Sequence, residues 1–231
     1  MNRVNQQSCL ILKSQAFKET SVIHQVFSRD YGLMSIISKG SRGKNSKHGA
    51  LLQAFRPLLL SWSGKSDLKT LIGAEEQYRI APLIGVALYC GFYVNELLLN
   101  LLHKHDSHPT LFNELEKVII KLSKLEEVEP ALRQFEKVLL EEIGYGLALG
   151  YDALSGSSID PDCQYTYRPE LGAVLAERNN DPESFLGSTL LNLQTNQLND
   201  KTELKQAKRL MRMLIDIQLD GKMLKSRELF K

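Results

Sequence analysis

The hydrophobic pattern of this chain changes its period once, near residue 80, and that change restricts the folds available to it. Before this point the apolar runs are short and are separated by Gly, Ser and Asp, which is typical of β-strands. The runs cover residues 9–12, 22–27, 33–37, 58–62 and 68–72. This pattern predicts a small β-domain over residues 1–80. A five-stranded OB-fold barrel is the simplest closed arrangement at this size.

After Ala81 the apolar positions recur with a helical period, and Pro82 suits the first turn of a helix. The pattern predicts an all-helical C-terminal domain over residues 81–231. Its expected helices cover residues 83–103, 109–125, 130–143 and 201–217, with a loop-rich insertion at about 144–182. The predicted fold class is therefore α+β, with an N-terminal barrel followed by helices.

Residues 83–102 are apolar over a length that could cross a bilayer. Asn95, Glu96 and Asn100 interrupt the run, and no cluster of cations flanks it. A buried core helix is the better interpretation, so we expect no membrane association. The first residues lack the apolar core of a signal peptide, and we expect a cytoplasmic, nucleoid-associated monomer.

Few residues suggest metal binding or catalysis. The three cysteines, Cys9, Cys90 and Cys163, are too far apart in sequence for a thiol metal site or a redox pair. The group His103, His105 and His108 could bind a metal, but it follows a predicted helix end, where polar side chains are favoured anyway. Recognisable nucleophile and nucleotide-loop motifs are missing from the sequence. We therefore expect a binding protein, not an enzyme, with no cofactor.

Charge is unevenly distributed along the chain. Residues 1–80 carry 12 Lys and Arg against 5 Asp and Glu, and residues 201–231 carry 9 against 4. The intervening 120 residues carry 8 against 18. Basic surfaces bind polyanions by releasing counterions, so both ends of the chain are candidate nucleic-acid contacts.

Two segments concentrate these cations. An acid-free Gly/Ser-rich loop between the third and fourth strands carries Lys39, Arg42, Lys44 and Lys47. On the 201–217 helix, four cations recur with helical spacing on one face: Lys205, Lys208, Arg209 and Arg212. Lys225 and Arg227 follow that helix and extend its basic character. A solvated hairpin loop and a solvated helix face are the alternatives.

Several local strings, in this order along the whole chain, resemble the bacterial recombination-mediator family RecO. None is specific alone, but the set is. The strings are Glu19-Thr-Ser21, Lys39-Gly40, Tyr93-Val-Asn95-Glu96-Leu-Leu98, Phe135-Glu136 with Ile143-Gly-Tyr145-Gly146, and Leu224-Lys-Ser226-Arg227-Glu-Leu-Phe230.

The resemblance implies an OB-fold and a helical domain that bind single- and double-stranded DNA and anneal complementary strands. It also implies action with RecR to load RecA onto strands coated by single-strand-binding protein, in DNA repair and recombination. From the charge pattern alone, an RNA-associated OB-fold protein is the alternative, and a purely structural adaptor is a third. We expect Tyr31, Phe55 and Trp62 to be core or edge residues of the barrel.

Many members of the family carry a four-cysteine zinc site in the loop-rich insertion. Alignment of the glycines puts Asp152, Ser155, Ala176 and Asn179 at the ligand positions, and none of these residues is a thiol. This chain therefore resembles the zinc-free proteobacterial members, and we expect its insertion to fold without metal.

The resemblance also implies a site for the acidic C-terminal tail of single-strand-binding protein. The string Pro130-Ala-Leu-Arg133-Gln-Phe135-Glu136 matches the helix concerned and assigns Arg133 to the terminal carboxylate. A guanidinium can take a carboxylate through two parallel hydrogen bonds, and Leu132 or Phe135 could supply an apolar floor. Pairing of Arg133 with Glu129 or Glu136 on its own helix is the alternative.

Overall fold

The computed structural model describes residues 3–43, 48–177 and 181–230. By compactness the chain divides into two units, which are described separately. The first contains Met1–Glu126 together with Leu224–Lys231, and the second contains Glu127–Met223.

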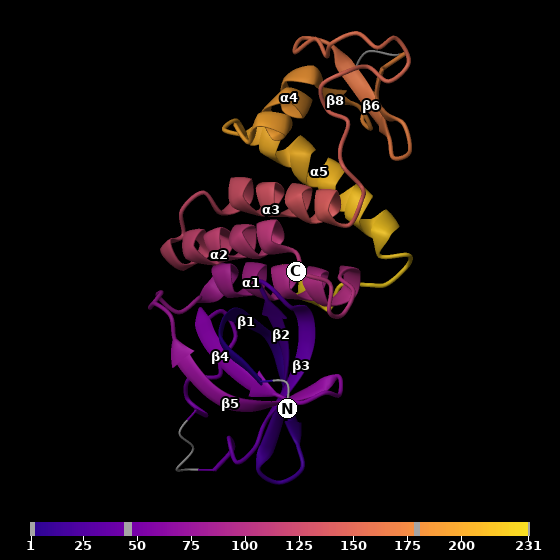
Figure 1. Ribbon diagram of the computed structural model, residues 1–231. Helices are drawn as coiled ribbons and strands as arrows, with labels where there is room; N and C mark the ends of the chain where they lie inside the picture. Colours follow the sequence, from indigo (N-terminus) through magenta and orange to yellow (C-terminus); the bar gives the residue numbers. More distant parts are fainter. Residues whose placement is uncertain (1–2, 44–47, 178–180, 231) are drawn as a thin grey trace. The chain divides into compact units, whose positions relative to one another are not determined.

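The first unit contains a closed barrel of five strands, which confirms the predicted fold class (Figure 1). The strands follow each other around the barrel in the order β1-β2-β3-β5-β4. Only the β3–β5 pair is parallel among the strand pairs of the described barrel residues. The strands are β1 (Arg3–Phe17), β2 (Ser21–Ser28), β3 (Gly32–Ser38), β4 (Leu58–Ser63) and β5 (Leu68–Glu76).

The barrel core comes from alternate strand residues that point inward. Trp62 is only 2% exposed and belongs to the same core cluster as Met34, Leu60 and Ala74. Phe55 is also buried, whereas Tyr31 is 40% exposed and lies edge-on to Trp62. These positions agree with the expected core and edge roles of the three aromatic residues.

Helix α1 (Gly85–Leu101) packs against the barrel through a polar contact as well as an apolar face. The register of β1 against β2 shifts between Ile11 and Lys13, which leaves the Leu12 carbonyl outside the strand ladder. The Asn95 side chain, 4% exposed, donates a hydrogen bond of 2.9 Å to that carbonyl. In the described residues no helix is long and apolar enough to cross a membrane.

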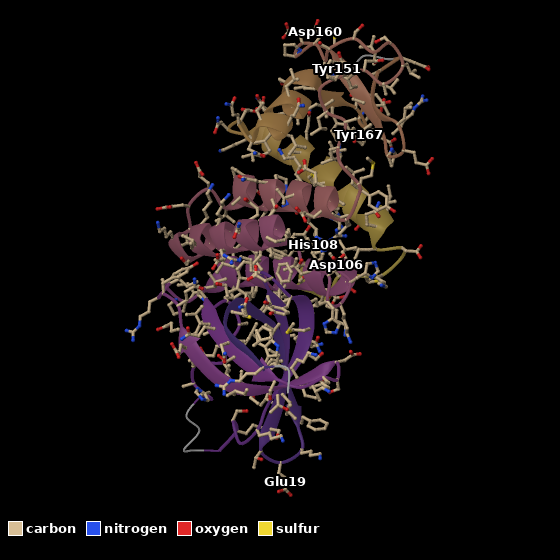
Figure 2. The ribbon with its side chains drawn as sticks, viewed as in Figure 1. Glu19, Asp106, His108, Tyr151, Asp160 and Tyr167 are labelled. Atoms are coloured by element: carbon tan, nitrogen blue, oxygen red, sulfur yellow. The ribbon has the colours of Figure 1, made fainter. Side chains whose placement is uncertain are left out.

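Helix α2 (Pro109–Lys124) begins at a proline and packs on the same unit, with Phe112 and Phe27 rings 5.6 Å apart. The segment before it passes close to the β2–β3 turn, where the His105 amide donates to the Leu33 carbonyl. Gly32 is required there: its φ is +65°, and a Cβ atom would lie 1.9 Å from the Asp106 carbonyl oxygen. Figure 2 labels Asp106 and His108 in this connection.

The C-terminal segment returns to the first unit as a 3-10 helix, η1 (Lys225–Phe230). The Glu96 carboxylate accepts hydrogen bonds from the backbone amides of Lys225 at 2.9 Å and Ser226 at 2.8 Å. Burial alone would raise the pKa of Glu96, but the side chain and amide of Ser226, together with Lys225, outweigh it and hold the pKa below its usual value. Glu96 and Lys225 belong to two of the strings that resemble the family. They are 129 residues apart in sequence, and the Glu96 carboxylate connects them through this hydrogen bond.

In its described residues the second unit contains three helices and a small sheet. Its helices are α3 (Val128–Glu142), α4 (Gly187–Thr195) and α5 (Lys201–Gln218), and Asp200 caps α5 by accepting from the Thr202 and Glu203 amides. The sheet has the order β7-β6-β8, with β6 (Gln164–Arg168), β7 (Gly172–Leu175) and β8 (Phe185–Leu186). The sequence pattern predicts loops at about residues 144–182 and no helix or strand at residues 183–200, because strands of two to five residues are too short to show a period.

The chain changes from strand to helix between Glu76 and Gly85, in the region of the domain boundary that the sequence predicts near residue 80. The boundary between the compact units lies later, after Glu126, so α1 and α2 are grouped with the barrel.

We expect the substitution Glu96→Gln to lower the free energy of unfolding by about 1–2 kcal/mol, since a neutral amide accepts the two backbone hydrogen bonds less strongly. The pKa of Glu96 is lowered in the folded state, so its contribution is complete above the unfolded-state pKa and is lost as pH falls through the folded-state pKa. Denaturant titrations from neutral to acid pH should therefore show the variant and the wild type converging at acid pH.

The matched control is Glu141→Gln, an exposed glutamate of α3. Equal stability of the two variants at neutral pH would contradict a special role for Glu96.

Candidate nucleic-acid interface

The basic loop starts where β3 ends, as the sequence predicted. Lys39 and Arg42 are exposed, and Gly40 between them has a φ of +69°. The Ser41 hydroxyl donates to the Ser38 carbonyl at 3.1 Å, which closes the first turn of the loop. Lys44 and Lys47 lie outside the described residues, so the structure places two of the four predicted loop cations.

This loop is tied to the β1–β2 hairpin by Arg42. Its amide donates to the Thr20 carbonyl at 3.1 Å, and its Nη1 donates to the Lys18 carbonyl at 3.2 Å. The three cations Lys18, Lys39 and Arg42 are therefore held near one another at the end of the hairpin. Sequence reasoning missed Lys18, because its proximity to Arg42 depends on strand pairing between segments 24 residues apart.

A buried chain of hydrogen bonds supports the base of the loop. His24 lies between two hydroxyls, with Nδ1 2.8 Å from Ser14 Oγ and Nε2 2.8 Å from Ser38 Oγ. Ser38 Oγ is in turn 2.7 Å from Ser41 Oγ. Burial lowers the pKa of His24 to about 4, so the ring is neutral at physiological pH and can donate through one nitrogen and accept through the other.

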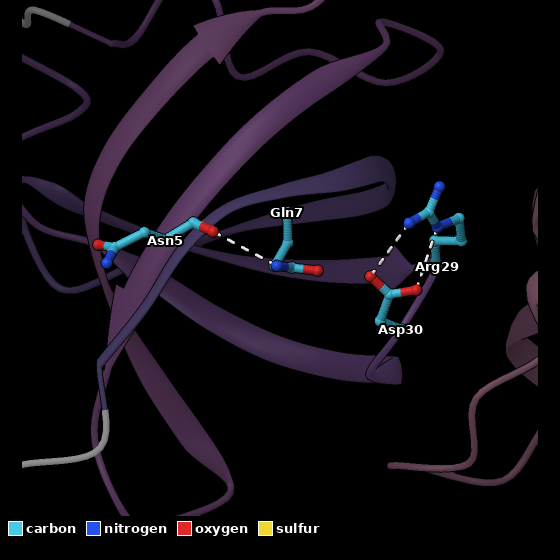
Figure 3. A network of polar contacts seen from close by, with 4 residues as sticks. All are labelled: Asn5, Gln7, Arg29 and Asp30. Atoms are coloured by element: carbon cyan, nitrogen blue, oxygen red, sulfur yellow. Dashed lines mark hydrogen bonds and ion pairs between the residues drawn. The ribbon is translucent and has the colours of Figure 1, made fainter.

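Some other cations of the first unit have carboxylate partners. Figure 3 shows Arg29 bound to Asp30, with Nε 3.0 Å from Oδ1, near a separate hydrogen bond from the Gln7 side chain to the Asn5 carbonyl. The neighbouring carboxylate of Asp30 raises the pKa of Arg29. Arg79 pairs with Glu76 in the same way at 3.0 Å. Within the described ranges, no carboxylate pairs with Lys18, Lys39 or Arg42, so their charge remains available to an anion.

The basic stripe of α5 exists as predicted, with Lys205, Lys208, Arg209 and Arg212 all exposed. Two of these cations lie near carboxylates: Lys208 is 3.8 Å from Glu129, and Arg212 is 3.8 Å from Asp216.

Arg209 also has an internal role. It donates to the Pro182 and Ser184 carbonyls and lies over the Phe185 ring, 4.4 Å from its centroid. Arg209 therefore fastens the start of β8 to α5.

The two cations of η1 differ in exposure. Lys225 is exposed, although its amide is bound by Glu96, and Arg227 is half-buried. Both belong to the unit of the barrel, whereas the α5 stripe belongs to the other unit.

Arg133 is 5% exposed, and its Nη2 donates to Glu136 Oε1 at 2.5 Å. This is the pairing that the sequence left open as the alternative to a carboxylate ligand. Leu132 and Phe135, the proposed floor, are 8% and 0% exposed. One turn further along α3, Lys137 donates to the Leu193 and Gln194 carbonyls at the end of α4.

The positions aligned with the zinc ligands of other family members are organised by a carboxylate. Asp152 Oδ1 accepts from the amides of Leu154 at 2.9 Å and Ser155 at 2.7 Å, and Oδ2 accepts from the Leu175 amide at 2.6 Å. The Ser155 and Leu175 amides hold the pKa of Asp152 below its usual value. Ala176 offers no ligand, and Asn179 lies outside the described residues, so this set of side chains does not fit zinc.

The histidine group does not converge either. His105 lies 3.6 Å from Asp67, and His108 lies 3.5 Å from Asp106. Over the described part of the chain, no group of three or more His, Cys, Asp or Glu side chains could hold a metal ion.

Comparison with known proteins agrees with the resemblance seen in the sequence. The family model described as Recombination protein O N terminal matches residues 1–77, and the one described as Recombination protein O C terminal matches residues 85–228.

Full-length relatives carry the same description. The DNA repair protein RecO of Dechloromonas aromatica (strain RCB) is 42% identical over 236 residues, covering 100% of this chain and 96% of that protein. The DNA repair protein RecO of Aliivibrio salmonicida (strain LFI1238) is 40% identical over 224 residues, covering 97% and 94%.

Because Asp152 binds amides from both sides of the insertion, we expect Asp152→Asn to lower the melting temperature by a few degrees. The pKa of Asp152 is lowered on folding, so this stabilisation is present above the unfolded-state pKa and disappears as pH falls through the folded-state pKa. Thermal melts of Asp152→Asn and of the exposed control Glu170→Gln, at neutral and acid pH, measure the effect. A chelator should leave both melts unchanged, and stoichiometric zinc in purified protein would contradict the metal-free assignment.

Proposed function

The chain belongs to the RecO family of DNA repair proteins, and we propose that it binds single- and double-stranded DNA through the barrel and promotes annealing of complementary strands. The observation that carries this proposal is the cluster of three exposed cations, Lys18, Lys39 and Arg42, in which Arg42 joins the basic loop to the hairpin backbone. A cluster without carboxylate partners can bind phosphates without first giving up an internal ion pair. Such contacts depend on salt and carry little sequence preference.

Annealing by this surface needs no covalent chemistry. Cationic contacts reduce the repulsion between two strands and leave their base edges open to pair. Contacts to phosphates can also slide along a strand, so two strands can find their register while bound. The protein then acts as a mediator and not as an enzyme.

The α5 stripe and the η1 cations are proposed as auxiliary contacts. Lys205, Lys208 and Arg212 are exposed enough to reach phosphates, but Lys208 and Arg212 already lie near carboxylates. Arg209 is the weakest candidate, since contact with DNA would compete with its backbone hydrogen bonds. Lys225 can add a contact beside the barrel.

We propose the α3 residue Arg133 as the receptor for the C-terminal carboxylate of single-strand-binding protein. In the structure its Nη2 holds the Glu136 carboxylate, so an incoming terminal carboxylate would replace an internal one. The guanidinium would keep a charged partner throughout, whereas the carboxylate of Glu136, which is 1% exposed, would lose this one. Family membership is the ground for the further proposal that the protein acts with RecR to load RecA.

Neutralising the loop cations tests the DNA site. We expect Lys39→Gln/Arg42→Gln to weaken binding of a thymidine homopolymer and to reduce the slope of log affinity against log salt by about 1.4, since each phosphate contact on a single strand contributes about 0.7. Fluorescence anisotropy over a salt series measures both quantities.

The control is Lys117→Gln/Lys124→Gln, which removes the same charge from α2. If both pairs of substitutions change the slope equally, only net charge matters and the loop is not the site. A parallel titration with an RNA homopolymer separates DNA repair from an RNA-associated role, which would require tighter RNA binding.

The tail site is tested by two variants that differ only at residue 133. We expect Glu136→Gln to bind a labelled peptide of the tail at least as tightly as wild type, because it removes the internal competitor. Arg133→Gln/Glu136→Gln should lose at least about tenfold in affinity, which corresponds to about 1.4 kcal/mol.

A peptide ending in an amide provides the second arm, since it lacks the carboxylate and should bind all variants equally weakly. Melting temperatures of both variants establish that they are folded. Equal affinity of the two variants for the acid peptide would remove Arg133 from the site.

A further inference from the structure

The β1–β2 hairpin extends past the end of β3. The pairing of β1 with β2 continues to Phe17 opposite Ser21, whereas the pairing of β2 with β3 ends with Val22 opposite Ser38. The tip therefore lies directly beside the start of the basic loop. Figure 2 shows Glu19 at this tip, at the end of the barrel away from α1, with its side chain directed away from the strands.

The side chain of Phe17 on this hairpin is 37% exposed and does not belong to the core cluster of the barrel. The Lys18 Nζ lies 5.5 Å from the centroid of its ring. A single exposed apolar side chain is ordinary, so its exposure alone means little. What distinguishes Phe17 is its place beside Lys18, on a hairpin to which Arg42 joins the basic loop.

The support of this hairpin and loop has two parts. Arg42 joins the basic loop to the hairpin through the carbonyls of Lys18 and Thr20. Beneath it, the hydrogen bonds from His24 to Ser38 and on to Ser41 hold the start of the loop. The backbone that carries Phe17, Lys18 and the start of the basic loop is thus held in one arrangement before any ligand binds, which reduces the entropy lost on binding.

An aromatic ring beside fixed cations is the combination by which proteins bind single-stranded nucleic acids without reading sequence. The ring stacks on a base, and the cations bind the adjoining phosphates. We propose that Phe17 is a base-stacking residue for single-stranded DNA, with Lys18, Lys39 and Arg42 holding the flanking phosphates. This inference rests on the proposed function and assigns to the same site a preference between single and double strands.

The preference follows from the geometry of the ligand. A single strand exposes base faces to Phe17, whereas in a duplex those faces are stacked inside the helix. The phosphates remain available in both. Annealing would therefore remove the contact to Phe17 while keeping the ionic contacts, so the duplex product is held less tightly than the strand that formed it.

The test compares Phe17→Leu with wild type on three probes: a thymidine homopolymer, an abasic homopolymer of equal length, and a duplex. We expect about a tenfold loss on the thymidine homopolymer and no change on the abasic strand or the duplex. The salt slope should stay at the wild-type value, because stacking releases no counterions. Phe17→Tyr keeps an aromatic ring and should restore binding.

Tyr151→Leu is the matched control, an exposed aromatic residue of the other compact unit that should change none of these affinities. Phe17→Trp adds a direct readout: its additional fluorescence should be quenched by the single strand and not by the duplex.

Equal loss on all three probes, or no loss on any, would overturn the stacking role. Failure of the proposed DNA site looks different, because Lys39→Gln/Arg42→Gln would then leave the salt slope unchanged even if Phe17 contributed to binding.

Discussion

The barrel depends on the length of β1, which pairs with two neighbours in succession. Its first half pairs with β4 and its second half with β2, so one strand closes the sheet on itself. The pairing of β1 with β2 has an irregularity at Leu12, whose carbonyl accepts a hydrogen bond from the Asn95 side chain. The same strand then continues past the barrel and forms the hairpin that carries Phe17 and Lys18. Closure and the candidate interface thus have a common origin.

The strands of the barrel and the long helices could be predicted from the sequence because each has a hydrophobic period several residues long. β6, β7 and β8 could not, since their stability comes from pairing with each other and from the hydrogen bonds of Asp152. The hydrogen bonds between Glu96 and η1 could not be predicted either, although both segments contain strings that resemble the family. A period reports which face of an element is buried, and it says nothing about which distant backbone amide a carboxylate will bind.

The candidate site divides in the same way. The cations of the loop and of α5 were predicted from spacing, but spacing does not distinguish Arg42, whose charge has no carboxylate partner among the described residues, from Arg209, which fastens β8 to its helix. Phe17 carries no signal in the sequence, since a single aromatic residue between two short apolar runs is common. It becomes informative only when Arg42 brings the loop to its side.

The acidic middle of the chain helps to explain why the barrel should dominate DNA binding. Residues 81–200 carry 18 Asp and Glu, and two of the α5 cations lie within 3.8 Å of carboxylates in their own unit. A phosphate approaching that helix must compete with Glu129 and Asp216. Among the described residues no carboxylate pairs with Lys39 or Arg42, although Glu19 lies at the adjoining hairpin tip. Salt weakens the attraction of both surfaces for phosphate. The difference between the two basic surfaces is therefore set by the acids beside them and not by the number of cations.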